Sequence, residues 1–346
     1  MKKFITICLV LLLCASTSYA VVRTDARDSR NSIESKIDGL SGSGRGTSWY
    51  VYSGASGSGS GSDWTNACLT IEAAIGKASA YDTINVGQAH NEAITTADNI
   101  DADKAGLYIK GHGRGSAMPT LDYDAAAGEF VIGADNVRVE NIRFRTSFND
   151  VTTAVDIETG ADYAEIVGCK FGYSEAVGTD EFISAITVAA ATQYTLVEDC
   201  YFNAGAAGAS QAITFSSVSG IKIKNSEIVG DYGIACVKNA AGGQDVVIEN
   251  STLFNGIKTA STTTSTINTE PAIELHATTG AYIAHNDIIS DVATALLMHV
   301  ADAAVFMDNY VSDQYGDDHS GTRESGTTVP LGTTATTTTI SGHIDG

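Results

Sequence analysis

A short strand-like sequence motif recurs through most of this sequence, and it constrains the fold more than any other feature. In its clearest copy, at 245–256, the apolar residues Val246 and Ile248 alternate, a turn-forming Asn250 follows, and the small residue Ser251 comes next. Asparagine, aspartate and glycine tolerate left-handed backbone angles, so each copy predicts a short strand that ends in a tight turn. When the copies are aligned on Ile248, the other anchor residues are Ile109, Val139, Ile166, Val197, Ile223, Ile283 and Phe306.

The spacing of these anchors predicts a solenoid. Successive anchors are 23 to 35 residues apart, and a period in this range with strand alternation is typical of repeats that stack on their neighbours. A second strand is predicted before most anchors, at 154–158, 185–189, 212–216, 234–237, 272–276 and 295–299. We therefore predict an all-β fold, a parallel β-helix of about eight rungs, where a rung is one turn of the coil.

The residues that follow the anchors also agree from rung to rung. Two places after the anchor most copies have Gly, Asn or Asp, and three places after it they have Ile142, Cys169, Cys200, Ser226, Ser251, Asn286 and Asn309. Strands stack about 4.8 Å apart, so like residues can form ladders inside the coil. Cys169 and Cys200 fall in consecutive rungs and are the one pair to test for a disulfide. The apolar positions of Cys68, Cys169, Cys200 and Cys236 favour buried thiols.

The first 20 residues have the pattern of a secretory signal peptide. Lys2 and Lys3 precede an apolar run at 4–13, and small residues lead to Ala20. The run is too short to span a bilayer, so we expect no membrane span and a secreted, extracellular or periplasmic protein, with attachment to a cell or virion surface as an alternative. The net charge of −21 becomes −23 when Lys2 and Lys3 are removed. Such a surface makes nucleic acid a poor partner.

The rest of the chain divides by composition. We expect a polar arm at 21–46, an N-terminal cap at 47–103, the β-helix at 104–313 and a Thr/Gly-rich tail at 314–346. The cap combines a strand, a Gly/Ser-rich loop and an amphipathic helix that starts near Leu69. A helix there would cover the open end of the solenoid, whose unpaired strand edges otherwise invite aggregation.

The order of the segments near the N-terminus is similar to that of a known superfamily. The segments 49–51, 63–64, 69–77, 82–86 and 107–115 resemble the beginning of the pectate-lyase-like right-handed parallel β-helix superfamily, and the likeness extends to about Asp313. Within that superfamily, 113–119 and 136–144 resemble uncharacterised secreted or virion-associated proteins of phage and marine metagenomic type. The resemblance implies a right-handed, single-stranded β-helix with a surface role, and it permits a trimeric homo-oligomer. It names no reaction.

Candidate catalytic groups are sparse. Gly111-His112-Gly113 is similar to the Gly-His-Gly of polygalacturonases, but the companion aspartate patterns are missing, so we interpret it as a structural turn. Lyase-type β-elimination needs a strong base; in the middle rungs only lysines are basic, and Lys222 and Lys224 are their sole close pair. The acidic pair and histidine at 317–319 lie beyond the last rung. We therefore predict no catalytic residue and lean against an enzyme.

Two further hypotheses concern binding. In our strand alignment His276 and His299 fall in adjacent rungs with Glu274 nearby, which are donor types of a transition-metal site. Tyr201 and Tyr310 share an outward column, where aromatic faces can stack on sugar rings. Ordinary exposed side chains are the alternative in both cases. No cofactor is otherwise expected, although polar and acidic loops keep calcium as an alternative.

We predict from these observations a structural or adhesive protein, secreted or on a particle surface, that presents a face to a polysaccharide, a cell-surface glycan or neighbouring subunits without catalysis. The alternative is a polysaccharide lyase or glycoside hydrolase of the pectate-lyase-like superfamily that acts along a groove. The negative net charge counts against polyuronate substrates unless calcium bridges the two, because like charges repel at low salt.

Overall fold

The computed structural model describes residues 46–173, 180–205, 209–256, 270–275, 280–290, 298–300 and 304–313. Apart from Gly46, these residues belong to one compact unit, Thr47–Gly346. The predicted leader, nearly all of the polar arm, the C-terminal tail and His276 lie outside the described residues. No described helix is long and apolar enough to cross a membrane.

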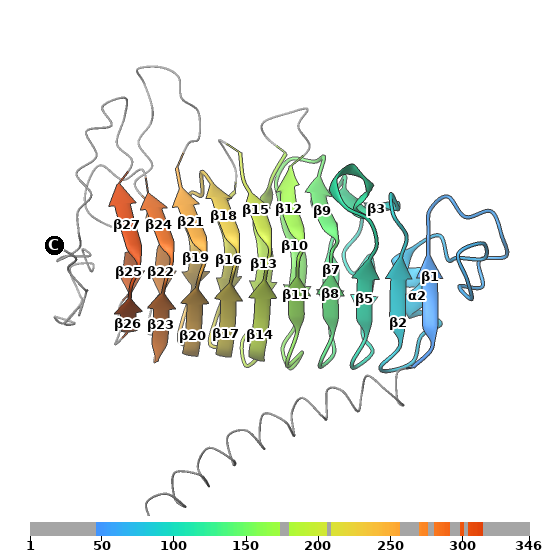
Figure 1. Ribbon diagram of the computed structural model, residues 1–346, viewed down its shortest axis with the longest axis horizontal. Helices are drawn as coiled ribbons and strands as arrows, with labels where there is room; N and C mark the ends of the chain where they lie inside the picture. Colours follow the sequence, from blue (N-terminus) through green and yellow to red (C-terminus); the bar gives the residue numbers. More distant parts are fainter. Residues whose placement is uncertain are drawn as a thin grey trace, which may run out of the picture. The chain divides into compact units, whose positions relative to one another are not determined.

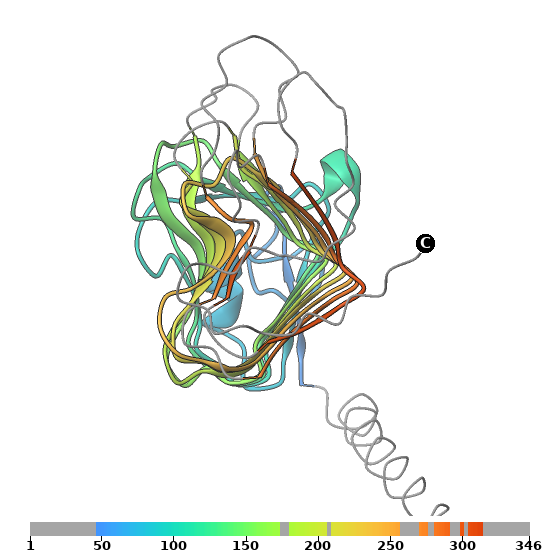
Figure 2. The ribbon, with the colours of Figure 1, turned by 90° about the vertical axis from the view of Figure 1, so that its left-hand side faces the viewer.

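The strands stack along the coil into three parallel sheets (Figure 1), and the three sheets enclose one core (Figure 2). The anchor sheet contains β1 (Ser48–Val51), β2 (Thr83–Val86), β5 (Tyr108–Gly111), β8 (Arg138–Glu140), β11 (Glu165–Val167), β14 (Gln193–Glu198), β17 (Ser219–Lys224), β20 (Gln244–Glu249), β23 (Ala281–Ala284) and β26 (Ala304–Met307).

The chain turns from the anchor sheet into the second sheet at a bend that we call the first corner. The second sheet contains β3 (Asn91–Ile94), β6 (Thr120–Tyr123), β9 (Arg143–Thr146), β12 (Lys170–Tyr173), β15 (Tyr201–Asn203), β18 (Glu227–Gly230), β21 (Thr252–Asn255), β24 (Asp287–Ser290) and β27 (Tyr310–Asp313).

The third sheet completes each rung, and a second corner leads from it back to the anchor sheet. It contains β4 (Ile100–Ala102), β7 (Phe130–Ile132), β10 (Val151–Ile157), β13 (Phe182–Val188), β16 (Gln211–Phe215), β19 (Ala235–Asn239), β22 (Ile273–Leu275) and β25 (Met298–Val300). Two short helices, α2 (Ile71–Ile75) and η1 (Gly115–Ala117), are the only helical elements among the described residues.

The predicted anchors form one continuous column. The parallel register pairs each anchor with the next, from Ile109 through Val139, Ile166, Val197, Ile223, Ile248 and Ile283 to Phe306. Each anchor whose side chain is described is fully buried. The predicted all-β parallel β-helix is therefore confirmed, because a register error of one residue would have turned the anchors outward.

The turn column after the anchors behaves as predicted, with one exception. The φ angles lie between 50° and 61° at Asn141, Gly168, Asp199, Asn225, Asn250, His285 and Asp308. Gly111 is not left-handed, and its small size has another reason: a Cβ atom there would lie 2.0 Å from the carbonyl oxygen of Asn141. Gly111 therefore allows two backbones to meet rather than forming a left-handed turn.

The next column forms the predicted internal ladder. The backbone N–H of Cys200 donates to Ser226 Oγ at 3.2 Å, that of Ser226 to Ser251 Oγ at 3.2 Å, and that of Ser251 to Asn286 Oδ1 at 2.9 Å. Asn286 N in turn donates to Asn309 Oδ1 at 3.0 Å. Buried backbone donors need such partners, so the ladder satisfies the inside of the first corner.

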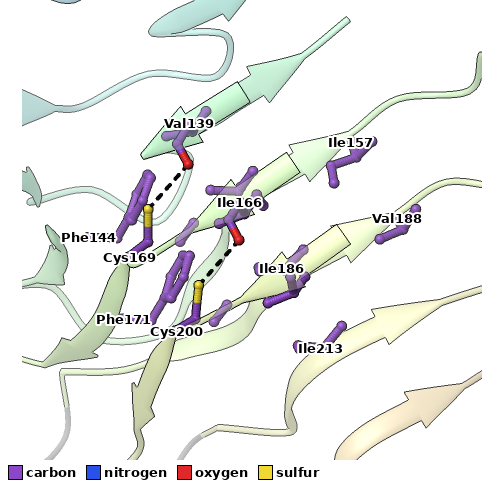
Figure 3. Close-up of a cluster of buried hydrophobic side chains, with 14 of the residues drawn as sticks. Val139, Phe144, Ile157, Ile166, Cys169, Phe171, Ile186, Val188, Cys200 and Ile213 are labelled. Carbon is purple, nitrogen blue, oxygen red and sulfur yellow. Dashed lines mark hydrogen bonds between the residues drawn. The ribbon is translucent and has the colours of Figure 1, made fainter. Parts of the chain in front are cut away.

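Thiols continue this column toward the N-terminus. Cys169 Sγ donates to Val139 O at 3.7 Å and Cys200 Sγ to Ile166 O at 3.4 Å (Figure 3). The four cysteines among the described residues, which include Cys68 and Cys236, are buried and free, as the apolar positions favoured, and Cys169 and Cys200 are not bridged. Burial raises the pKa of the Cys200 and Cys236 thiols.

The solenoid starts earlier than predicted. β1 pairs in register with β2, and β2 pairs in register with β5. β3 and β4 are the first strands of the other two sheets. The rungs therefore begin at Ser48 and not at residue 104. The early rungs escaped the pattern because their first corner lacks the Asn/Asp-plus-small-residue signature.

The predicted capping helix is present but short. Thr70 Oγ1 accepts the Ala73 N–H at 3.2 Å, and the helix ends before Gly76. Its buried residues include Ile71 and Ile75, and it packs against β1, β2 and β4. Leu69 is instead 54% exposed.

Candidate functional site

One first-corner connection differs from its neighbours. Two residues join the anchor sheet to the second sheet in each rung from β8–β9 to β26–β27, whereas eight residues, 112–119, join β5 to β6. This long loop carries η1, which stands outside the coil in Figure 2. The next rung fixes it: Asn141 Nδ2 donates to the carbonyl oxygens of Gly111 and Gly113 at 2.8 and 3.0 Å, and Arg143 Nη2 donates to that of Gly115 at 2.7 Å.

A groove of about 550 Å³ lies between this loop and the first corner of the following rungs. Its lining combines residues of the loop with outward residues of the anchor sheet, and we call it the corner groove: Lys110, Gly111, His112, Gly113, Arg114, Arg138, Glu140, Asn141, Val167, Gly168 and Asp199. The groove exists because the long loop adds a wall to a corner that is otherwise smooth.

Arg138 is neutralised within the groove. Its guanidinium contacts Glu140 at 2.8 Å and Glu165 at 2.5 Å, and the Tyr108 hydroxyl donates to the same Glu140 oxygen at 2.6 Å. Burial, together with the hydrogen bond to Glu140, raises the pKa of Tyr108 to about 12. The phenol therefore stays protonated and serves as a hydrogen-bond donor.

Lys110 and Arg114 are the other two cations that line the groove. Neither forms an ion pair within the described part of the chain, although Lys110 Nζ lies 5.7 Å from the centre of the Tyr108 ring. Lys110 is partly exposed and Arg114 is exposed. Lys110 is the register neighbour of Glu140, whose carboxylate contacts Arg138. In a chain with a net charge of −21, two cations that form no ion pair of their own within the described residues can attract an anion to this corner.

His112 lies between these cations and the N-terminal rungs. Its Nε2 lies 3.0 Å from Asn85 Oδ1, while Asn85 Nδ2 donates to the Trp49 carbonyl at 3.4 Å. This amide orientation makes Nε2 the protonated nitrogen and leaves Nδ1 with the lone pair. Burial and then the charge of Lys110 lower the pKa of His112 below its ordinary value of 6.5. The ring is therefore neutral at pH 7, and His112 lines the groove as well as forming the predicted turn.

An exposed indole flanks the groove. Trp64 packs edge-on against His112, with ring centroids 5.6 Å apart, and against Tyr50 at 4.8 Å. It is 44% exposed. A Cβ on Gly87 would lie 3.1 Å from the indole, so that glycine leaves room for it.

Three residues of this site, Trp64, Lys110 and Arg114, were not predicted from the sequence. The available signal was the length of the β5–β6 corner, which the repeat alignment could have compared with the two-residue corners that follow. The meeting of Trp64 with His112 depends on the register of the first rungs, which were not recognised as rungs.

The predicted tyrosine column is present. The register of the second sheet runs Arg143, Lys170, Tyr201, Glu227, Thr252, Asp287 and Tyr310. Four strand steps, about 19 Å, separate Tyr201 from Tyr310, so they do not contact the same sugar ring. Tyr201 lies beside Lys170. Glycan binding by these two tyrosines stays a prediction.

The expected histidine alignment is wrong. The β22–β25 register pairs His299 with Glu274 and not with His276, which lies outside the described residues. The error arose because the connections between strands differ in length from rung to rung. The number of residues between neighbouring strands of one sheet therefore does not apply to another sheet. Among the described residues, no group of three or more His, Cys, Asp and Glu side chains is placed to hold a metal ion. The metal and calcium hypotheses stay predictions.

The two candidate lysines of the middle rungs are paired. Lys222 Nζ lies 2.6 Å from Glu249, and Lys224 Nζ lies 2.6 Å from Glu198. An ammonium group that is engaged in an ion pair is not free to act as a general base. The acidic and histidine residues at 317–319 lie outside the described residues.

No protein-family model matches this chain, and no curated protein is similar to it in sequence. Among solved structures it is similar to the pectate lyase Pel9A, with 14% identity over 79% of each chain and a TM-score of 0.39. It is also similar to a rhamnogalacturonan lyase, with 9% identity over 78% of this chain and 87% of that chain and a TM-score of 0.34. Both similarities are remote.

Proposed function

We propose that this protein is a secreted, non-catalytic β-helix rod that binds an anionic glycan in the corner groove. The observation that carries the proposal is the presence of two cations that form no ion pair within the described residues, Lys110 and Arg114, in a groove of about 550 Å³ flanked by the exposed Trp64. Carboxylate or sulfate groups form charge-assisted hydrogen bonds with such cations. The apolar face of a sugar ring packs on an indole.

The surrounding charge supports selectivity. A net charge of −21 repels an acidic polymer over most of the surface, so attraction is confined to the cationic corner. Both cations are solvent-accessible, and salt screens such interactions over about 8–10 Å. Binding is therefore expected to weaken steeply as ionic strength rises.

The absence of catalysis is proposed from the state of the charged side chains. Arg138, Lys222 and Lys224 are engaged in ion pairs of 2.5 to 2.8 Å, so none is a free base. The leader at 1–20 and the repetitive rod suit a protein that displays a binding face outside the cell.

A second candidate function is cleavage of the same glycan by β-elimination. The observation that favours it is His112, a neutral ring with an unprotonated Nδ1 beside two cations. In that reaction the cations would neutralise a uronate carboxylate while the imidazole removes the adjacent carbon-bound proton. The electron pair left by that proton would form a carbon–carbon double bond as the glycosidic oxygen leaves.

The two functions separate in one experiment. Wild-type protein is incubated with acidic and neutral polysaccharides, and co-sedimentation is measured together with the absorbance of unsaturated products. We expect binding of an acidic polymer without product, and a loss of at least tenfold in affinity in the K110A/R114A variant. Lys77→Ala is the control, since Lys77 is also exposed and forms no ion pair within the described residues.

Failure of every acidic polymer to bind would contradict the proposal. Product formation that disappears in His112→Ala would replace it with the second candidate.

A further inference from the structure

The second corner, where the third sheet turns into the anchor sheet, is built by a column of left-handed residues. Their φ angles lie between 53° and 88°, and the residues are Tyr81, Gly106, Asn136, Tyr163, Tyr194, Gly220, Asp245 and Gly280. Five of these eight are Gly, Asn or Asp, the residue types that accept this conformation. The other three are tyrosines.

Turn formation does not explain these tyrosines. A bulky side chain disfavours positive φ, and such outliers gather where a side chain has a role beyond the fold. The same column shows that residues such as Asn136 make the same corner without that strain. The presence of tyrosine side chains at these three positions therefore requires an explanation other than turn formation.

The three rings are exposed along this corner, and we call them the tyrosine ridge (Tyr81, Tyr163 and Tyr194); Gly106 and Asn136 separate Tyr81 from the adjacent pair Tyr163 and Tyr194. Tyr163 and Tyr194 stack with centroids 5.2 Å apart and an interplanar angle of 17°. The three rings stay 48%, 49% and 54% exposed in chain order. Tyr81 lies over Gly106 and Tyr194 over Gly220, where a Cβ would lie 2.2 and 2.9 Å from the rings.

The ridge and the corner groove border the same face. Each strand of the anchor sheet runs from the second corner to the first, so Tyr163 and Gly168 lie at opposite ends of β11. Five residues of extended chain span about 17 Å. The Arg138–Glu165 ion pair lies between the two ends. One glycan chain can therefore contact both features by crossing this short face.

We infer that the tyrosine ridge is an aromatic subsite for the glycan bound in the corner groove, and that it recognises polymer over short fragments. The inference rests on the proposed function. Sugar rings that extend beyond the cations would pack on the exposed parts of Tyr163 and Tyr194. The strain of the left-handed tyrosines is retained because the rings serve this contact.

The test uses full-length protein with two substitutions, Tyr163→Asn and Tyr194→Asn, in one variant. Asparagine is chosen because Asn136 occupies the same column, so the corner should form and the melting temperature should not fall. The ligands are an acidic polysaccharide that wild type binds and a disaccharide fragment of it. Tyr282→Ala, on the same sheet near the C-terminal end, is the control.

We expect the ridge variant to bind the polymer about tenfold more weakly, which corresponds to about 1.4 kcal/mol, with unchanged affinity for the disaccharide. The K110A/R114A variant should lose both ligands. Unchanged polymer affinity in the ridge variant, or an equal loss for both ligands, would overturn the ridge inference alone. If wild type binds no acidic ligand, the proposed function and the ridge inference fail together.

Discussion

At the scale of single residues, the inner column of the first corner shows how one buried amide can serve several backbone groups. Asn286 is 1% exposed. Its Oδ1 accepts the Ser251 N–H at 2.9 Å, and its Nδ2 donates to Ile248 O at 2.8 Å and to Asn309 Oδ1 at 3.0 Å. Removing this one side chain therefore leaves three polar groups, in two other rungs, without this partner.

Asn286→Ala is expected to lower the free energy of unfolding by about 2–4 kcal/mol, because several buried polar groups lose their partners. Urea denaturation followed by circular dichroism measures it. Ser226→Ala is the matched comparison: its hydroxyl accepts one N–H and donates to one carbonyl, so its loss should be about 1 kcal/mol. Equal effects from the two variants would argue against the ladder as the source of the stability.

The second residue-scale prediction concerns His112. Lys110→Ala should raise the pKa of His112 toward 6.5, and Glu140→Gln should lower it further, because Glu140 favours the charged ring. Since folding lowers this pKa, the stability that the neutral ring contributes is present above about pH 6.5 and is lost as the pH falls below it. NMR titration of the His112 ring measures both shifts. A pKa that does not respond to Lys110→Ala would place the cation away from the imidazole.

At the scale of elements, the third sheet carries crowded carboxylates at its N-terminal end. Burial, followed by repulsion from Asp156, Asp98 and Glu158, raises the pKa of Glu129 from 4.5 to about 7. The folded state therefore holds a proton that the unfolded chain releases. The resulting stability is fully present below pH 4.5 and is lost as the pH rises through about 7.

Glu129→Gln imitates the protonated carboxyl and should remove this dependence. We expect wild type and variant to have similar melting temperatures at pH 4.5, and the variant to melt higher at pH 8. Calorimetry at several pH values measures the difference. Glu227→Gln on the second sheet is the control, because its register neighbours Tyr201 and Thr252 are uncharged. Identical pH profiles for wild type and Glu129→Gln would contradict the assignment.

At the scale of the whole molecule, the sequence predicts the coil better than the site. The fold repeats one pattern of alternation and turn, so each rung supports the alignment of the others, and anchors from Ile109 to Phe306 were found at their true register. The early rungs lack the turn signature, and their strands were assigned to a cap.

The corner groove could not be found from the repeat, because it is a departure from the repeat. Its walls come from an eight-residue loop and from strands that follow it, and Trp64 reaches His112 across 48 positions of sequence. Likewise, the His276–His299 alignment failed because connection lengths vary between sheets. The strands that repeat from rung to rung can therefore be predicted from their local sequence pattern. Contacts made by an inserted loop depend on the register of the folded chain, and the sequence pattern does not give them.

Binding of an anionic glycan in the corner groove can be measured by amide hydrogen exchange with and without an acidic polysaccharide. We expect slower exchange in peptides covering Lys110 to Gly115 and Arg138 to Asn141, with smaller protection near Tyr163. Exchange on the third sheet should not change. Protection confined to the third sheet, or none at the groove while the polymer is bound, would contradict binding in the corner groove.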